Sequence, residues 1–392
     1  MNMRIRHLSS FLLILSLSSS LFSASAQDKI SVTPIGRVHV DGALYFPSKE
    51  GFSNGASLPE IRAGVKALYA KWMARIEIGY SYGKIGMKDV YIQRSLGEKD
   101  FLRLGYFIPQ FGIRGGGSAS YKPAMISQVS ETFFRTTTRK IGIGYTRYNP
   151  SYFLSATAFV GGRSLTLTST EQGKVSAGGA IRGVWHPIAK PGAIAHIGGS
   201  ISYETASHTR LINDMGDEEA SEGFRTFSAS FPTTVSKVPM LEAEVTNAVG
   251  DWKLSPEITL AKDRFALESQ FYYMKVPRHN GTPSYHAVGT YGMVRCLLFG
   301  DKQYRYSEAE GALALPSPKS LELIAGYDYT NADTRAAAID GGISNDWNVT
   351  LNYYINKYMV ARLRYSYTDV RNSSVCERIG VNIIQARLQF VF

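Results

Sequence analysis

Segments of about ten residues in which polar and apolar side chains alternate recur along most of the chain. The pattern is plainest in residues 347–354 (WNVTLNYY) and returns in 363–367 (LRYSY). Because successive side chains of a β-strand point to opposite faces, this alternation predicts strands with one polar and one apolar face. A soluble β-sandwich alternates in the same way, so the spacing of the strands is needed to identify the fold class.

Sixteen strands and almost no helix are expected. The strands lie near residues 33–45, 58–69, 72–81, 85–95, 100–107, 139–148, 152–160, 175–185, 195–204, 251–260, 265–275, 285–299, 320–329, 346–354, 359–369 and 379–392.

The links between these strands alternate in length. The short ones are 70–71, 96–99, 149–151, 261–264 and 355–358, and the long ones are 46–57, 108–138, 161–174, 205–250 and 330–345. Two links break the rule, because 82–84 is short and 300–319 is long. Short turns that alternate with long loops, together with an even strand count, are typical of a transmembrane antiparallel β-barrel with periplasmic turns and extracellular loops. We therefore predict an all-β outer-membrane barrel spanning residues 27–392.

Composition excludes several other classes. A chain with 44% hydrophobic and 12% aromatic residues is too apolar to be intrinsically disordered. Two cysteines cannot staple a chain of 392 residues. Beyond the first 30 residues there is no apolar run of about 18 residues, the length that a membrane-spanning helix needs. A secreted sandwich or propeller is the competing interpretation, and it lacks the expected repeat signature.

The first 26 residues resemble a secretory signal peptide. Arg4 and Arg6 precede an apolar stretch, and Ala24-Ser25-Ala26 has the small residues of a cleavage site, which predicts cleavage before Gln27. An N-terminal membrane anchor is the alternative, but the apolar stretch is short for a span. We expect an exported protein of the Gram-negative outer membrane.

Several segments resemble the phosphate-selective porin family, the O/P-type porins of Gram-negative outer membranes. The matching segments are RVHVDG (37–42), LPEIRAGVK (58–66), KDVYIQ (88–93), PQFG (109–112), RKIGIGY (139–145), PKSLEL (318–323) and LNYYIN (351–356). The resemblance implies a diffusion channel for small solutes, a homotrimer, and a long loop after 109–112 that narrows the pore. The terminal Phe392 resembles the signal that such barrels present to their assembly machinery. The expected surroundings are lipid and lipopolysaccharide.

Strand parity predicts which basic side chains face the lumen. On 58–69, apolar Ile61, Ala63 and Val65 are expected to face lipid, which turns Arg62 and Lys66 inward. The same argument places further arginines inward, at Arg37, Arg75, Arg103, Arg182, Arg362, Arg364 and Arg387. A basic wall concentrates anions, so the expected solutes are small anions, with phosphate or polyphosphate as candidates. The alternative is that these arginines form structural pairs with inward carboxylates, at Asp41, Glu60, Glu77, Asp89 and Glu322.

Two long links have contrasting charge. Residues 108–138 contain Arg114, Lys122 and Arg135 against Glu131 alone, and a Gly-rich bend at 115–117, so this link is the candidate constriction loop. An ordinary extracellular loop is the alternative. Lys140, where the chain returns to the barrel, completes the candidate anion path. Residues 205–250 carry an acidic run and are expected to form a solvated extracellular loop.

Signals for other chemistry are missing from the sequence. There is no G-x-S-x-G elbow, H-E-x-x-H helix or P-loop, so we expect no enzyme, cofactor or metal site. No nucleic-acid module accompanies the excess of 43 Lys and Arg over 32 Asp and Glu. A barrel whose long loops carry an enzymatic or adhesive function remains the alternative. Cys296 and Cys376 are expected at opposite ends of the barrel, too far apart for a disulfide.

Overall fold

The computed structural model describes residues 29–46, 51–115, 122–135, 139–161, 173–174, 176–206, 208–212, 218–220 and 223–392. The expected signal peptide at 1–26, Gly116 and Gly117, and most of the acidic run of the 205–250 link lie outside these ranges.

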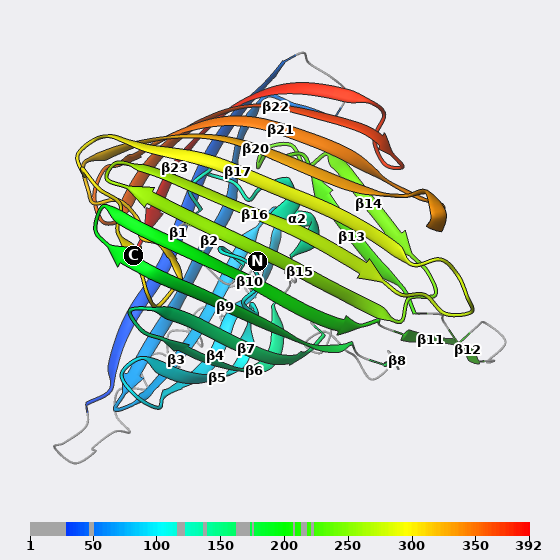
Figure 1. Cartoon of the computed structure of the whole chain (residues 1–392), viewed down its shortest axis with the longest axis horizontal. Coiled ribbons are helices and arrows are strands. Elements are labelled where there is room, and N and C mark those ends of the chain that lie inside the picture. Colours follow the sequence, from blue (N-terminus) through cyan, green and yellow to red (C-terminus); the bar gives the residue numbers. More distant parts are fainter. Residues whose placement is uncertain are drawn as a thin grey trace, which may run out of the picture.

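Sixteen antiparallel strands close into one barrel (Figure 1), which confirms the predicted fold class and strand count. The barrel strands are β1 (Ser31–Phe46), β2 (Gly55–Tyr69), β3 (Trp72–Ser81), β4 (Lys84–Ser95), β5 (Asp100–Phe107), β6 (Lys140–Tyr148), β7 (Tyr152–Val160), β9 (Ala177–Lys190), β10 (Ala193–Thr205), β15 (Gly250–Lys262), β16 (Phe265–Val276), β17 (Tyr285–Phe299), β20 (Ser320–Thr334), β21 (Ile339–Tyr354), β22 (Met359–Ser373) and β23 (Ile379–Val391). Each of the sixteen predicted segments overlaps one of them.

Burial in the barrel wall is the reverse of that in a soluble protein. On β21, Trp347 and Val349 are 47% and 44% exposed on the outside, while Asn348 and Thr350 are buried inside. The same inversion runs along β22, where Leu363 is exposed and Arg364 is buried. An apolar outer face and a polar inner face are what a barrel surrounded by lipid requires.

Outward aromatic side chains gather on neighbouring strands. Trp347 packs between Tyr327 and Tyr367, with ring centroids 5.2 and 5.9 Å away, and Phe299 packs on Tyr353 nearer the end with short turns. Such clusters agree with the aromatic belts expected at membrane boundaries. No helix among the described residues is long and apolar enough to cross a membrane.

The two ends of the barrel sheet meet directly. β1 pairs with β2 on one side and with β23 on the other, so Asp41 faces Arg387 across the seam. The seam ends where Gly36 and Phe392 exchange backbone hydrogen bonds of 2.9 and 3.0 Å. The sheet therefore has no open edge, which removes the unpaired backbone groups that lipid could not satisfy.

The link 330–345 is shorter than predicted. β20 and β21 continue the alternation to Thr334 and Ile339, so that only a 3-10 turn, η3 (Arg335–Ala337), and Ala338 at φ 54° join them. The wall is consequently tall here, whereas β5, β6 and β7 have only eight or nine residues each (Figure 1).

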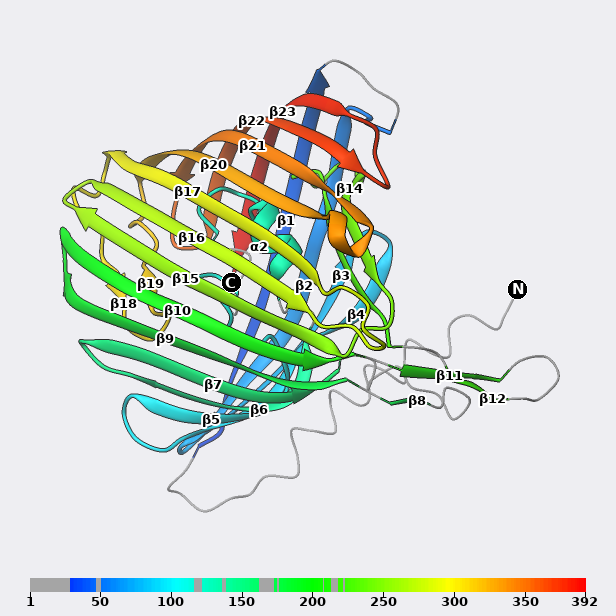
Figure 2. The same cartoon turned by 45° about the vertical axis from the view of Figure 1, so that its right-hand side comes forward.

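Three links fold into the lumen. The first, described over 108–115 and 122–135, carries the short helix α2 (Val129–Phe134), and the third, 300–319, carries the strand pair β18 (Tyr306–Ser307) and β19 (Ala312–Leu313). The second lies in 223–249 and forms the hairpin β13 (Arg225–Ser230) and β14 (Pro239–Val245). From the sequence, all of 205–250 is expected to lie outside the barrel. Residues 223–249 differ from that expectation, because they lie inside it. Among the described residues of this link, β11 (His208–Ile212) and β12 (Glu218–Ala220) extend beyond the barrel wall, where β11 also pairs with β8 (Gly173–Lys174) (Figure 2).

The physical reason for the inward hairpin is that its tip satisfies buried polar groups of the barrel wall. Thr234 donates a hydrogen bond to Asp41, and Gln385 donates one of 2.8 Å to the carbonyl of Pro232. Phe227 and Phe231 of the same hairpin belong to the main buried apolar cluster. The acidic charges noted in the sequence precede this part and gave no sign of it.

The two cysteines are not joined by a disulfide. Cys296 pairs in register with Phe265, beside the short turn 263–264, and Cys376 lies in the link between β22 and β23 at the opposite end. This arrangement agrees with the sequence-based expectation.

Candidate pore lining

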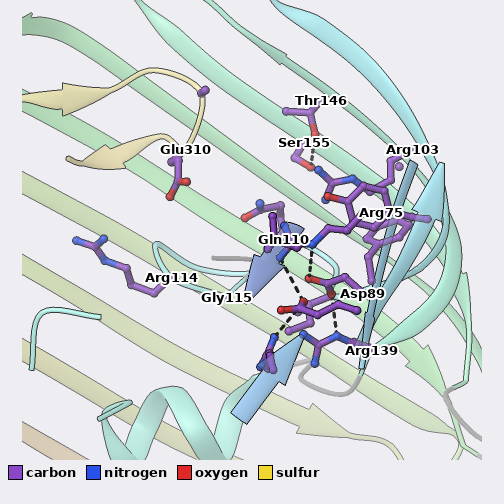
Figure 3. Close-up of a pocket in the computed structure, with 18 of the residues that line it drawn as sticks. Arg75, Asp89, Arg103, Gln110, Arg114, Gly115, Arg139, Thr146, Ser155 and Glu310 are labelled. Atoms are coloured by element: carbon purple, nitrogen blue, oxygen red, sulfur yellow. Dashed lines mark hydrogen bonds and ion pairs between the residues drawn. The ribbon is translucent and has the colours of Figure 1, made fainter. Parts of the chain in front are cut away.

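An open cavity of about 640 Å³ remains beside the infolded segments. It lies between the inner faces of β1–β7 on one side and residues 108–115 and 122–135 on the other (Figure 3). Eight basic and five acidic side chains line it: Arg37, Arg62, Arg75, Arg103, Arg114, Lys122, Arg135 and Arg139, with Glu60, Glu77, Asp89, Glu131 and Glu310. The basic excess makes this cavity the candidate path for anions.

Four of these arginines alternate with three carboxylates in a continuous row, which we call the arginine ladder: Arg37, Glu60, Arg62, Glu77, Arg75, Asp89 and Arg139. It starts with Arg37 Nε at 3.0 Å from Glu60 Oε2 and continues with Arg62 Nη1 at 3.5 Å from Glu77 Oε2. It ends with Arg139 Nε at 2.8 Å from Asp89 Oδ1 (Figure 3).

Strand geometry explains why the arginine ladder forms. Residues two apart on a strand share a face, so Glu60 and Arg62 on β2 point inward together, as do Arg75 and Glu77 on β3. The antiparallel register then places Gly64 opposite Glu77. The distance from Glu77 Oε2 to Arg75 Nη2 in their ion pair is 3.2 Å. The sequence-based alternative of structural pairing therefore holds for the ladder, although it still contains one more arginine than carboxylates.

Arg103 differs from the ladder because its hydrogen-bond partner is neutral. Its guanidinium donates to Gln93 Oε1 at 2.9 Å and lies 4.3 Å from the centroid of the Tyr91 ring. No carboxylate among the described residues forms an ion pair with it. Phe101 and Phe107 flank the same guanidinium at 5.3 and 5.4 Å. Arg103 thus presents an uncompensated positive charge to the cavity, held in place by aromatic rings.

The wall beside Arg103 adds neutral hydrogen-bonding groups. Thr146 and Ser155, on β6 and β7, are hydrogen-bonded to each other at 3.2 Å and line the cavity with Thr157 and Gln110 (Figure 3). Hydroxyl and amide groups can replace part of the hydration shell of a passing ion.

The described residues of this segment, 108–115 and 122–135, lie in the lumen and are held by the wall at several points. The backbone N–H of Gly112, at φ 78°, donates to Ser200 Oγ at 2.9 Å. Asn352 donates to the carbonyl of Pro123, and Arg387 donates to that of Met125, both at 2.9 Å. These hydrogen bonds join the segment to inward-facing residues of β10, β21 and β23, and its role as a constriction stays a prediction.

Helix α2 fixes the far end of this segment. Ser130 donates its backbone N–H to both carboxylate oxygens of Asp328 at 3.1 Å, and its hydroxyl also binds this carboxylate. The Phe134 ring stacks on that of Tyr272 with centroids 5.4 Å apart. These contacts bury α2 against β16, β17 and β20, across the lumen from β1–β7, while its residue Glu131 lines the cavity.

The three basic residues of this segment have different surroundings. Arg114 Nη2 lies 3.0 Å from Glu268 Oε2, and Lys122 pairs with Glu131. No ion pair is found for Arg135 within the described part of the chain, and its Nε is buried without a hydrogen-bond partner. Burial lowers the pKa of both Lys122 and Arg135 from their ordinary values. Of the three basic residues of this segment, Arg135 is therefore the one whose positive charge is least balanced by a carboxylate.

Several predicted pore residues face inward but do not reach the cavity. Arg182 pairs with Glu257 at 2.7 Å and binds the carbonyls of Glu310 and Gly311. Arg364 and Arg387 pair at 2.7 Å with Asp346 and Asp41. Their guanidinium groups bind carboxylates of the wall and backbone carbonyls of the infolded segments.

The remaining three predicted residues are also outside the cavity lining. Arg362 donates to the carbonyl of Lys122, which helps to hold residues 122–135 in the lumen. Lys140 pairs with Glu204 at 2.7 Å. Lys66 is half-buried on β2 and is absent from the lining.

Sequence reasoning missed two charged residues of the lining. Arg139 immediately precedes β6, and the heptapeptide that starts with it was noted only for its resemblance. Glu310 belongs to the link 300–319 on the short-turn side, and the unusual length of that link is the signal that could have pointed to it. Parity on β6 and β7 would have found the inward Thr146, Ser155 and Thr157.

A family model described as phosphate-selective porin O and P matches residues 36–392. The chain belongs to this porin family. It is accordingly an outer-membrane channel of a Gram-negative bacterium, with the short turns on the periplasmic side and the long links on the extracellular side. No match was found among curated proteins.

Solved porins share the fold at low sequence identity. OmpT of Vibrio cholerae with loop L8 deleted has a TM-score of 0.57 and 10% identity, over 93% of this chain and 99% of that chain. The anion-selective porin from Comamonas acidovorans has a TM-score of 0.57 and 10% identity, over 93% and 100%. In-vitro folded OmpT of Vibrio cholerae in its trimer form has a TM-score of 0.57 and 9% identity, over 93% and 99%.

The infolding of 108–135 leads to a labelling prediction. In a background where both cysteines are replaced by Ser, Met125→Cys should react slowly with a membrane-impermeant maleimide on intact cells, because Met125 is 1% exposed. Asn280→Cys, in the exposed link 277–284, should react fully and serves as the control. Equal labelling of the two positions would show that the segment does not stay in the lumen.

Proposed function

We propose that this porin prefers small anions and that they pass along the wall formed by β1–β7. The observation that carries the proposal is the cavity itself, in which eight basic side chains face five acidic ones. The two least compensated cations, Arg103 and Arg135, lie on opposite sides of it. A positive potential in a narrow space with low-dielectric walls raises the local concentration of anions and lowers that of cations.

Phosphate or polyphosphate is the candidate solute within this class. Guanidinium groups bind phosphate oxygens in a bidentate manner, and the arginine ladder presents them in sequence along one wall. Arg75 is the ladder arginine with the most exposed side chain, at 31%, so it can meet a solute without breaking all of its ion pairs. The intervening carboxylates weaken each contact, which favours transit over permanent binding.

The charge of Arg103 should have a measurable effect on selectivity. In planar bilayers with a KCl gradient, the wild-type reversal potential should lie on the anion side of zero. Arg103→Gln should lower the anion-to-cation permeability ratio roughly two- to threefold, the effect of a fall of about half a kT per unit charge in local potential, which acts on anions and cations in opposite directions. Arg371→Gln removes the same charge from the exposed extracellular end of β22 and should leave the ratio unchanged. A reversal potential that is the same in wild type and Arg103→Gln would remove Arg103 from the anion path.

Phosphate binding in the arginine ladder predicts a saturable block. Addition of inorganic phosphate at constant ionic strength should lower the chloride current of the wild type towards a plateau. Arg75→Gln should shift the half-blocking concentration upward, because it removes the most exposed guanidinium of the ladder. A current that changes only linearly with the chloride fraction would leave an anion-preferring channel without a phosphate site.

We also propose a homotrimer that is inserted through recognition of Phe392. The trimer form of the structurally similar OmpT supports the first part, and the exposed C-terminal aromatic at the barrel seam supports the second. Unheated gel electrophoresis of outer membranes should show a band near three times the monomer mass, and deletion of Phe392 should reduce its amount. A monomer band in the wild type would refute the trimer, and full assembly of the truncated chain would refute the role of Phe392.

A further inference from the structure

The outer face of β15 shows where the membrane begins and ends on this wall. Its outward side chains Leu254, Ile258 and Leu260 are apolar, and they lie between Trp252 at one end and Lys262 at the other. Trp252 and Lys262 are ten residues apart. At about 3.3 Å per residue and a tilt of about 40°, this separation corresponds to a height of about 25 Å, the height of the apolar band of an outer-membrane barrel. Trp252 therefore lies at the extracellular boundary of the membrane, and Lys262 lies at the periplasmic one.

Four outward side chains form a row along this extracellular boundary. The backbone register pairs Tyr203 of β10 with Trp252 of β15, and it pairs Trp252 with Lys275 of β16. Lys275 is in turn opposite His286 of β17. The four strands are neighbours in the barrel wall (Figure 1), so the row forms a continuous surface about 14 Å wide. We refer to these four residues as the boundary row.

Lys275 brings a positive charge to the boundary row that no carboxylate of the described residues balances in an ion pair. Its side chain is exposed on the outer face. The charges at the same height of β15, Asp251 and Lys253, are buried on the inner face and pair with each other at 3.1 Å. On β20, the strand beyond β17, Asp333 accepts the backbone N–H of Gly342 at 2.6 Å. The Lys275 ammonium is therefore left to pair with an anion from its surroundings.

The neighbours of Lys275 suit the head group of a lipid. The rings of Tyr203 and Trp252 have centroids 4.5 Å apart, and Trp252 is 48% exposed. Amphipathic rings of this kind favour the level of lipid head groups. On the other side of Lys275, the Tyr273 hydroxyl lies 2.7 Å from His286 Nδ1. A hydroxyl that donates to Nδ1 leaves the imidazole proton on Nε2, which makes His286 a second N–H donor beside the ammonium.

We propose that the boundary row is a binding site for the phosphorylated sugar head group of the outer-leaflet glycolipid, lipopolysaccharide. Lys275 pairs with a sugar phosphate, and His286 donates a hydrogen bond to the same phosphate. Tyr203 and Trp252 pack on the sugar and on the first carbons of the acyl chains. A phosphate that is anchored by acyl chains is held at this depth, which is why the site suits a lipid. The site faces the membrane, so it is separate from the lumen and goes beyond the proposed anion preference.

Lipid A binding by the protein in mild detergent tests this site. Native mass spectrometry should detect bisphosphorylated lipid A on the wild type. Lys275→Gln should raise its dissociation constant about fivefold, the effect of one lysine beside an anionic head group. Lys275→Arg keeps the charge and should bind as the wild type does. An unchanged dissociation constant in Lys275→Gln would overturn the assignment.

The matched control is a lysine at the other membrane boundary. Lys262→Gln removes the same charge from the outer face of the adjacent strand β15, at its periplasmic end, and should leave the dissociation constant unchanged. An equal rise in Lys262→Gln and Lys275→Gln would show that only the net charge matters and would refute a site. Because Lys275→Gln could fail to assemble, Trp252→Leu provides a second measurement and should weaken binding about twofold. Unchanged binding by the assembled Trp252→Leu barrel would remove the aromatic part of the site.

Further probes identify the occupant of the boundary row. Lipid A without phosphates should bind the wild type about fivefold more weakly than the bisphosphorylated form, and equal binding of the two forms would refute the role of the phosphate. Displacement of lipid A by an equimolar amount of inorganic phosphate would assign the row to free phosphate and overturn the lipid site. A Lys275→Gln variant that loses the trimer band and still binds lipid A normally would assign the row to a contact between protomers. These measurements involve no ion current, so a channel without anion preference would refute the proposed function and leave this inference standing.

Discussion

The absence of water in the lipid core is the constraint on which this structure depends. Every backbone N–H and C=O of the spanning segments must find a partner within the protein, and a closed sheet achieves this without an edge. The pairing of β1 with β23 completes that closure. Closure in turn forces side chains to alternate between lipid and lumen, which is why Trp347 and Val349 are exposed while Asn348 and Thr350 are buried.

A polar lumen creates a second requirement, because buried charges need partners. Three links that fold inward meet this requirement. Their backbone carbonyls accept hydrogen bonds from Arg182, Arg362, Arg364 and Arg387. Charges that could have lined a wide pore are thereby used to hold the segments that narrow it. The cavity described above lies along the wall of β1–β7, where the arginine ladder and Arg103 line it.

The wall could be predicted from the sequence because lipid imposes the two-residue period on each strand independently of the rest. All sixteen strands and the inward direction of residues such as Arg62 followed from that period. Parity does not reveal what an inward side chain meets. Arg103 and Arg364 have the same strand signature, yet one faces the cavity and the other binds Asp346 and the carbonyl of Pro232. That difference depends on contacts between Arg364 and a hairpin 132 residues away in the chain, which have no local periodicity.

The alternation of charge within the arginine ladder has a physical consequence for transport. Four neighbouring guanidiniums without carboxylates would repel one another and would hold a multivalent anion too tightly to release it. With Glu60, Glu77 and Asp89 between them, each arginine keeps only part of its attraction for a solute. A path of this kind offers a series of weak and similar sites in place of one deep site. Because flux requires both entry and release, a modest positive excess spread along the wall suits a diffusion channel better than a concentrated one.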